Sequence, residues 1–420
     1  MEDLVKRKGK SLVFEVGGYV AHAAEVPVAF DRVVRRSYGH YLEDFGPGTV
    51  FVHPRGVTLD RGAMLAYART FMEANPLYLN EEFAKAHGYE SLPAAPHMVM
   101  NLALSLGVQN DSEKAIANLG YWDVRFLRPV YAGDTLTGKT RVVERKDRGA
   151  DKPGIITVET LAANQDGRVV IQYRRKIMVP RRGAEPIIDA TSDATSDATS
   201  DATSDTLDGS AAGPEGQAEF GWHETPKLHV PFVRGAKGSG LTSADSALGA
   251  FEAGQIWLHG NGRTVTDEHF GWTYQVMNTH PLHFDRLYSQ GLTGAMSGEP
   301  IVYGGLAFAW LLGLASRDVS ENAVWELGFH AGFHTQPLVA GDTLYALTRV
   351  LSVEPSESER VGVVRMQLIG LKNLRPNAAL EKYGADLFIA EDSKKALGKD
   401  KISEKVFEIE RSLLIRVDPA

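Results

Sequence analysis

Runs of β-branched and other apolar residues recur in pairs along this chain. Residues 155–161 and 169–179 form one pair, separated by a turn that contains Asp-Gly, a strong signal for a β-hairpin. Residues 361–371 and 406–417 repeat the pair, although a charged segment at 391–405 separates them. The pattern predicts an antiparallel sheet in each half of the chain.

Helices are predicted ahead of each sheet. Residues 301–315 are the most apolar run, but they are too short to span a bilayer and contain three glycines, so we expect a buried helix. Thr266 is followed by two acidic residues, which is typical of a helix N-cap. Each half therefore indicates an α+β unit with a helix packed on one face of an antiparallel sheet.

The two halves also share short motifs at equal spacing. One motif consists of phenylalanine, glycine, histidine, glycine and threonine: Phe45, Gly48, His53, Gly56 and Thr58, then Phe251, Gly254, His259, Gly262 and Thr264. Residues 125–136 are echoed by residues 332–344, with one gap. Repetition in the same order indicates a duplicated unit of domain size that packs against its twin. Because His53 and His259 occur in both halves, we assign them to the fold rather than to chemistry.

A low-complexity segment separates the halves. Residues 189–204 are four tandem copies of Asp-Ala-Thr-Ser, which offer no large apolar side chain to offset the entropy of ordering. We therefore expect an N-terminal extension at 1–40, a first domain at 41–182, an acidic linker at 183–240 and a second domain at 241–420.

Composition excludes several classes of protein. The chain has 420 residues, a formal charge of −8 and no cysteine. Thiolate metal sites, a cysteine nucleophile and disulfides are therefore excluded, and no basic surface for nucleic acid or an anionic membrane is indicated. The first residues lack the pattern of a secretory signal, so we expect a cytoplasmic protein.

Residues 278–285, Asn-Thr-His-Pro-Leu-His-Phe-Asp, resemble the signature of MaoC-type hydratases, usually Gly-Asp-x-Asn-Pro-x-His. The first half offers Glu-Ala-Asn-Pro-Leu-Tyr at 73–78, which keeps Asn-Pro but lacks the histidine. Residues 301–306 resemble the start of the central helix of a hotdog unit, and residues 96–98 occupy the corresponding place in the first half. Residues 115–121 and 340–343 are similar to one branch in particular, the mesaconyl-CoA hydratases or β-methylmalyl-CoA dehydratases.

The resemblance implies a tandem hotdog fold of class α+β, in which each unit is an antiparallel sheet wrapped around a central helix. It also implies reversible hydration of a small acyl-CoA thioester, most closely mesaconyl-CoA to β-methylmalyl-CoA. Coenzyme A would be part of the substrate, and no metal or redox cofactor is expected. The expected partner is this small molecule, with no nucleic acid and no membrane; the halves would form a pseudo-dimer, and a homodimer is left open.

Hydration of an enoyl thioester needs a proton acceptor for water and a proton donor for the α-carbon. His283 is the preferred acid and base because the unperturbed pKa of histidine is about 6.5. Asn278 stands where common R-specific hydratases carry aspartate; it can orient a water molecule but cannot accept its proton. His283 would then perform both transfers, or a carboxylate such as Asp285 or one on the substrate would assist. The structural alternatives are a hydrogen-bonded core histidine at 283 and a helix cap at 278.

Further residues are assigned to substrate binding. Tyr303, Gly304 and Gly305 lie where the resemblance places a helix N-terminus, whose N–H groups would stabilise the enolate-like oxygen. The glycines would let the thioester approach the backbone, or would only pack a helix tightly. A substrate carboxylate would need a cation; Arg125 is the candidate, with His97, His330 and His334 behind it.

Two other functions stay open. One is a general R-specific enoyl-CoA hydratase or acyl-ACP dehydratase for longer uncharged chains. The other is a catalytically silent acyl-CoA-binding protein, which the loss of aspartate at 278 and of histidine at 78 would favour.

Overall fold

A computed structural model describes residues 36–183, 220–223, 227–231, 240–292 and 297–418, and the backbone of two short strands before them. The chain divides into two compact units, Met1–Ser37 and Tyr38–Ala420. In the first, β1 (Val5–Lys8) pairs antiparallel with β2 (Ser11–Phe14). The Asp-Ala-Thr-Ser copies and most of the expected linker lie outside the described residues, as does most of the expected extension at 1–40.

The second unit is built on one antiparallel sheet of eleven strands. Its order is β3-β5-β6-β7-β4-β10-β13-β12-β11-β8, with β9 also paired to β11, so the two halves of the chain contribute equivalent strands on either side of the β4–β10 junction. The strands of the first half are β3 (Val50–Thr58), β4 (Ala117–Phe126), β5 (Thr135–Lys146), β6 (Gly154–Ala163) and β7 (Val169–Val179). Those of the second half are β8 (Ile256–Leu258), β9 (Arg263–Thr264), β10 (Ala323–His334), β11 (Thr343–Pro355), β12 (Val361–Lys372) and β13 (Lys405–Arg416).

The predicted strand pairs are confirmed in both halves. β6 and β7 form the expected hairpin, and Gly167 in its turn has φ +74°, a conformation that glycine adopts without a Cβ penalty. β12 and β13 form the equivalent antiparallel pair. The connection between them carries α7 (Pro376–Tyr383).

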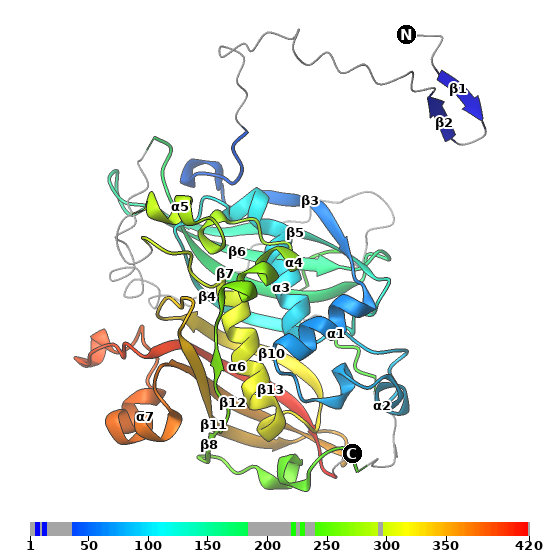
Figure 1. Cartoon of the computed structure of the whole chain (residues 1–420), viewed down its shortest axis with the longest axis vertical. Helices are drawn as coiled ribbons and strands as arrows, with labels where there is room; N and C mark the ends of the chain where they lie inside the picture. Colours follow the sequence, from blue (N-terminus) through cyan, green and yellow to red (C-terminus); the bar gives the residue numbers. More distant parts are fainter. Residues whose placement is uncertain are drawn as a thin grey trace. The chain divides into compact units, whose positions relative to one another are not determined.

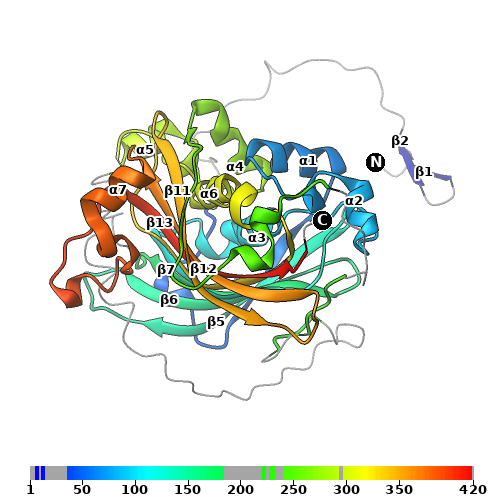
Figure 2. The same ribbon diagram turned by 90° about the horizontal axis from the view of Figure 1, so that it is seen from below.

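A central helix lies on the concave face of each half-sheet. α3 (Pro96–Gly107) and α6 (Gly304–Val319) lie side by side, with the sheet curving around them (Figures 1 and 2). They touch directly, because Asn101 Nδ2 donates a hydrogen bond to the Gly305 carbonyl at 2.9 Å. Packing against both sheet and partner helix buries almost all of α6, as the apolar run at 301–315 predicted. This is the tandem hotdog fold.

Shorter helices accompany the central pair. They are α1 (Arg61–Thr70), α2 (Glu81–Ala86), α4 (Gly271–Gln275) and α5 (Arg286–Gln290). The cap predicted at Thr266 is confirmed: its backbone N–H donates to His269 Nδ1 at 2.9 Å, and a 3₁₀ turn at Asp267–Phe270 leads into α4. No helix among the described residues is long and apolar enough to cross a bilayer.

The repeated histidines have the shared structural role that their duplication indicated. His53 Nε2 lies 2.9 Å from the Thr140 hydroxyl on β5, and His259 Nε2 lies 2.8 Å from the Thr348 hydroxyl on β11. Both imidazoles are buried. Each ties the segment before the helices to the same strand of its own half-sheet.

Candidate active site

A cavity of about 410 Å³ lies at the junction of the two halves. The second half contributes the signature turn, the N-terminus of α6 and the end of β10; the first half contributes the end of α3, the start of β4 and part of β7. Among the described residues that line it there is no aspartate or glutamate. Polar and ionisable side chains in the wall are Ser112, Asn118, Tyr121, Arg175, Asn278, His280, His283, Tyr303, His334, Thr335, Gln336 and Lys401.

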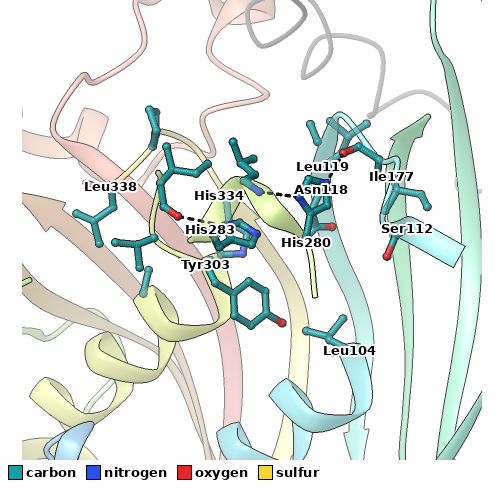
Figure 3. Close-up of a pocket in the computed structure, with 18 of the residues that line it drawn as sticks. Leu104, Ser112, Asn118, Leu119, Ile177, His280, His283, Tyr303, His334 and Leu338 are labelled. Atoms are coloured by element: carbon teal, nitrogen blue, oxygen red, sulfur yellow. Dashed lines mark hydrogen bonds between the residues drawn. The ribbon is translucent and has the colours of Figure 1, made fainter. Parts of the chain in front are cut away.

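His283 lies in this wall beside Tyr303 at the start of α6 (Figure 3). Its Nδ1–H donates to the Ile301 carbonyl at 3.1 Å, which leaves Nε2 with the lone pair of the neutral ring. Desolvation by burial, the neighbouring His280 and then His334 lower the pKa of His283 to about 3, despite the opposing hydrogen bond to Ile301. Near pH 7 the ring is therefore neutral and can accept a proton.

Two further imidazoles flank it. His280 Nε2–H donates to the Ala115 carbonyl at 3.3 Å, while its Nδ1 accepts the Leu282 N–H at 3.2 Å. His334 Nε2 lies 3.2 Å from the Tyr121 hydroxyl. Burial lowers the pKa of each to about 4, so neither adds positive charge to the cavity near neutral pH.

Asn278 lines the cavity from the signature turn. Its Oδ1 accepts the His280 N–H at 2.9 Å, and the side chain is buried. The helix cap considered as the structural alternative at 278 is instead made by His280, while Asn278 supports the turn and lines the cavity.

The N-terminus of α6 faces the cavity through Tyr303 and Gly304. The first N–H groups of a helix have no acceptor within it, and the helix dipole makes them a site for negative charge. A Cβ on Gly304 would lie 2.5 Å from the His334 ring, so glycine lets that ring approach the helix end. A Cβ on Gly305 would lie 1.9 Å from Asn101 Oδ1, so this glycine serves the contact between the two central helices and does not line the cavity.

The signature of the first half surrounds a second, far smaller cavity of about 20 Å³. Glu73 and His97 pair there, with His97 Nε2 3.2 Å from Glu73 Oε2. Burial alone would raise the pKa of Glu73, but the hydrogen bond and charge of His97 lower it overall. Arg411 and Glu326 of the second half close the space; Arg411 Nε donates to Glu326 Oε1 at 3.3 Å, and Nη2 donates to Oε2. A void of this size holds about one water molecule.

The structure therefore does not bring all the predicted residues together. His283, Asn278, Tyr303 and Gly304 line the large cavity, whereas His97 belongs to the small one. Arg125 is exposed on β4 and is not in either wall, and His330 is likewise absent from both. Asp285 is exposed and caps α5, where its Oδ1 accepts the Tyr288 N–H at 3.0 Å; it does not line the cavity and offers no second carboxylate there.

Arg175 was missed by the sequence analysis. It lies on β7 with 5% of its surface exposed, and it lines the large cavity. A signal was present: Ile171, Tyr173, Arg175, Ile177 and Val179 form one inward row in which only the middle residue is charged. β13 repeats this with Arg411 between Ile409 and Leu413.

Comparisons with known proteins agree with this architecture. A sequence profile described as mesaconyl-CoA hydratase matches residues 21–376. The mesaconyl-CoA hydratase of Cereibacter sphaeroides is 28% identical over 348 residues, 81% of this chain and 91% of the relative. The β-methylmalyl-CoA dehydratase of Chloroflexus aurantiacus is 28% identical over 343 residues, 80% of this chain and 89% of the relative.

Solved structures show the same fold. A MaoC domain protein dehydratase from Chloroflexus aurantiacus superposes with a TM-score of 0.73 at 25% identity, covering 91% of this chain and 99% of that one. A double-hotdog protein from Mycobacterium tuberculosis has a TM-score of 0.59 at 22% identity, covering 90% and 98%. With the profile matching most of its length and the signature residues around one cavity, the chain belongs to the mesaconyl-CoA hydratase family.

Proposed function

We propose that the chain is a hydro-lyase that reversibly hydrates a small branched or dicarboxylic enoyl-CoA thioester, mesaconyl-CoA to β-methylmalyl-CoA. The observation that carries the proposal is the neutral imidazole of His283 in the wall of the large cavity, next to the N-terminus of α6. The relatives named for this reaction in both directions support it.

The proposed reaction uses His283 for both proton transfers. Nε2 removes a proton from water as the oxygen adds to the β-carbon, and the negative charge moves to the thioester oxygen. The first N–H groups of α6 stabilise that charge. The imidazolium then returns the proton to the α-carbon, and the developing enolate beside it favours the protonated ring despite its burial. Asn278 orients the water molecule.

The test is the loss of enoyl-thioester absorbance when purified protein is mixed with mesaconyl-CoA. His283→Ala should lower kcat by about 10² to 10⁴, the range of general acid-base catalysis. Tyr78→Phe is the matched control, because Tyr78 holds the equivalent place in the first-half signature and lines only the small cavity. It should change kcat by less than about threefold, well under one general acid-base contribution.

Two outcomes would contradict the proposal. Equal activity of His283→Ala and wild type would remove the catalytic assignment. A wild type that binds acyl-CoA esters but hydrates none would favour the silent binding protein.

A further inference from the structure

We infer that Arg175 binds a free carboxylate on the acyl group, so that the large cavity selects dicarboxylic over uncharged acyl-CoA esters. The inference rests on the proposed acyl-CoA function and names the group that determines its substrate class.

Strand register establishes which residues are equivalent. On β4 and β7, Tyr121 pairs with Arg175; on β10 and β13, Phe329 pairs with Arg411. Asn118 pairs with Ile177, and Glu326 pairs with Leu413. Gly120 and Gly328, two residues further along, share an unusual backbone, with φ +153° and +155°. Arg175 thus corresponds to Arg411, and Asn118 to Glu326.

The small cavity shows what this arginine position binds. There Arg411 donates two hydrogen bonds to the Glu326 carboxylate, in the bidentate geometry that guanidinium and carboxylate favour. In the large cavity the residue equivalent to Glu326 is Asn118, which is uncharged and one methylene shorter. Both Asn118 and Arg175 line the open space. The place that a protein carboxylate fills in one half is therefore open to a ligand in the other.

Arg175 has donors left for such a ligand. Its hydrogen bonds to described residues both leave from Nη2, to Asp111 Oδ1 at 3.2 Å and Ser112 Oγ at 3.3 Å. The buried Nε–H has no acceptor among the described residues. A guanidinium carries five N–H donors, so a second acceptor can bind without displacing Asp111.

The charges around the cavity favour an anion. No described lining residue is a carboxylate, and Asp111 itself is not in the wall. The imidazoles of His280, His283 and His334 are neutral near pH 7, so they neither attract nor repel it. Arg175 is then the buried cation of the wall, whereas Lys401, the other cation there, is exposed. A buried carboxylate needs such a partner, and an uncharged acyl group gains nothing from it.

The experiment measures Kd by isothermal titration calorimetry for two saturated esters that cannot react: methylsuccinyl-CoA and 2-methylbutanoyl-CoA. They share a carbon skeleton, and the second has a methyl group in place of the carboxylate. Wild type should bind methylsuccinyl-CoA about 10²-fold more tightly, within the range measured for a buried charge pair. Mesaconyl-CoA hydration is measured separately on the same samples.

Asn118→Glu places a protein carboxylate beside Arg175, as Glu326 lies beside Arg411, and should reduce the preference to within about threefold, as expected when the guanidinium is already paired. Asn118→Gln has the same length without the charge and should keep the preference. The double variant Arg175→Met with Asp111→Asn removes the cation without leaving a buried carboxylate unpaired at 111. It should abolish the preference for methylsuccinyl-CoA.

The two hypotheses fail in different ways. Equal affinity of wild type for both esters, or a preference that survives in Asn118→Glu and in the double variant, would overturn the role of Arg175 even if hydration is observed. A wild type that prefers methylsuccinyl-CoA but hydrates no enoyl-CoA would overturn the proposed reaction and leave the carboxylate site supported.

Discussion

Replacing His280 by asparagine tests the buried state of the imidazoles around the cavity. The first half supplies the precedent, because Asn75 caps the equivalent turn: its Oδ1 accepts the Leu77 N–H at 2.9 Å, as His280 Nδ1 accepts the Leu282 N–H. Asparagine should therefore preserve the turn while removing a titratable group. At pH 8 we expect the free energy of unfolding to change by less than about 1 kcal/mol, the typical value of a cap.

The pH dependence follows from the lowered pKa. Burial holds the pKa of His280 at about 4 in the folded protein, whereas an unfolded chain binds the proton near pH 6.5. Above pH 7.5 both states are neutral, so the group contributes no pH dependence. Between pH 6.5 and pH 4 only the unfolded state is protonated, so stability falls as the pH falls. Linkage gives a loss of about 2 kcal/mol at pH 5 relative to pH 8 for this group.

The assay is equilibrium urea unfolding of wild type and His280→Asn at pH 8 and pH 5, followed by tryptophan fluorescence. Between the two pH values the variant should lose about 2 kcal/mol less stability than wild type, because it lacks this proton-binding group. Equal losses would refute the reasoning, since they would mean that His280 titrates alike in the folded and unfolded states.

Three further substitutions test other parts of the structure. Gly313→Ala would place a Cβ 1.7 Å from the Phe71 carbonyl oxygen, so α6 must shift, and urea unfolding should show a free energy of unfolding lower by about 3 kcal/mol or more. Gly271→Ala is the control, because its Cβ would meet nothing within 4 Å. Glu391→Gln would remove a carboxylate that pairs with the buried ammonium groups of Lys394 and Lys405, and urea unfolding should show a loss of about 3 to 5 kcal/mol. The control is Glu404→Gln in the more exposed pair with Lys382, which should cost less than about 1 kcal/mol. In Asn278→Asp the new carboxylate should still accept the His280 N–H, so the fold should be kept; a melting temperature lower by more than about 5 °C would contradict this. The variant should also extend hydration to an uncharged crotonyl-type thioester, as followed by absorbance.

Periodicity and duplication predicted most of the fold, because strands and buried helices are determined by local patterns that survive in both copies. The hairpin β6–β7 required only the apolar runs and the Asp-Gly turn, and the pair β12–β13 and the buried helix α6 required only their apolar runs. The signature likewise identified His283 and Asn278, and the helix-start element at 301–306 identified Gly304; all three line the same cavity.

Side chains that reach the cavity from other strands could not be assigned in this way. Arg125 and Arg175 both lie in strands of the first half, and only the strand register and the pleat decide that Arg175 points inward while Arg125 is exposed. Asp285 is adjacent in sequence to the signature, yet its carboxylate is occupied by the cap of α5. Closeness in sequence to the signature therefore suggested Asp285, which does not line the cavity, and gave no sign of Arg175, which does.

Joining the two hotdog units in a single polypeptide has a consequence for how the sites could diverge. In a homodimer of identical subunits each substitution appears in both symmetry-related sites, so neither site can change alone. Here only the second half has the signature histidine, at 283, and only the first half has an acid in its signature, at 73. Asn118 leaves Arg175 accessible in the large cavity, whereas Glu326 pairs with the equivalent arginine in the small one. The small cavity can therefore serve only the structure, and each polypeptide should bind a single acyl group, in the large cavity, rather than two.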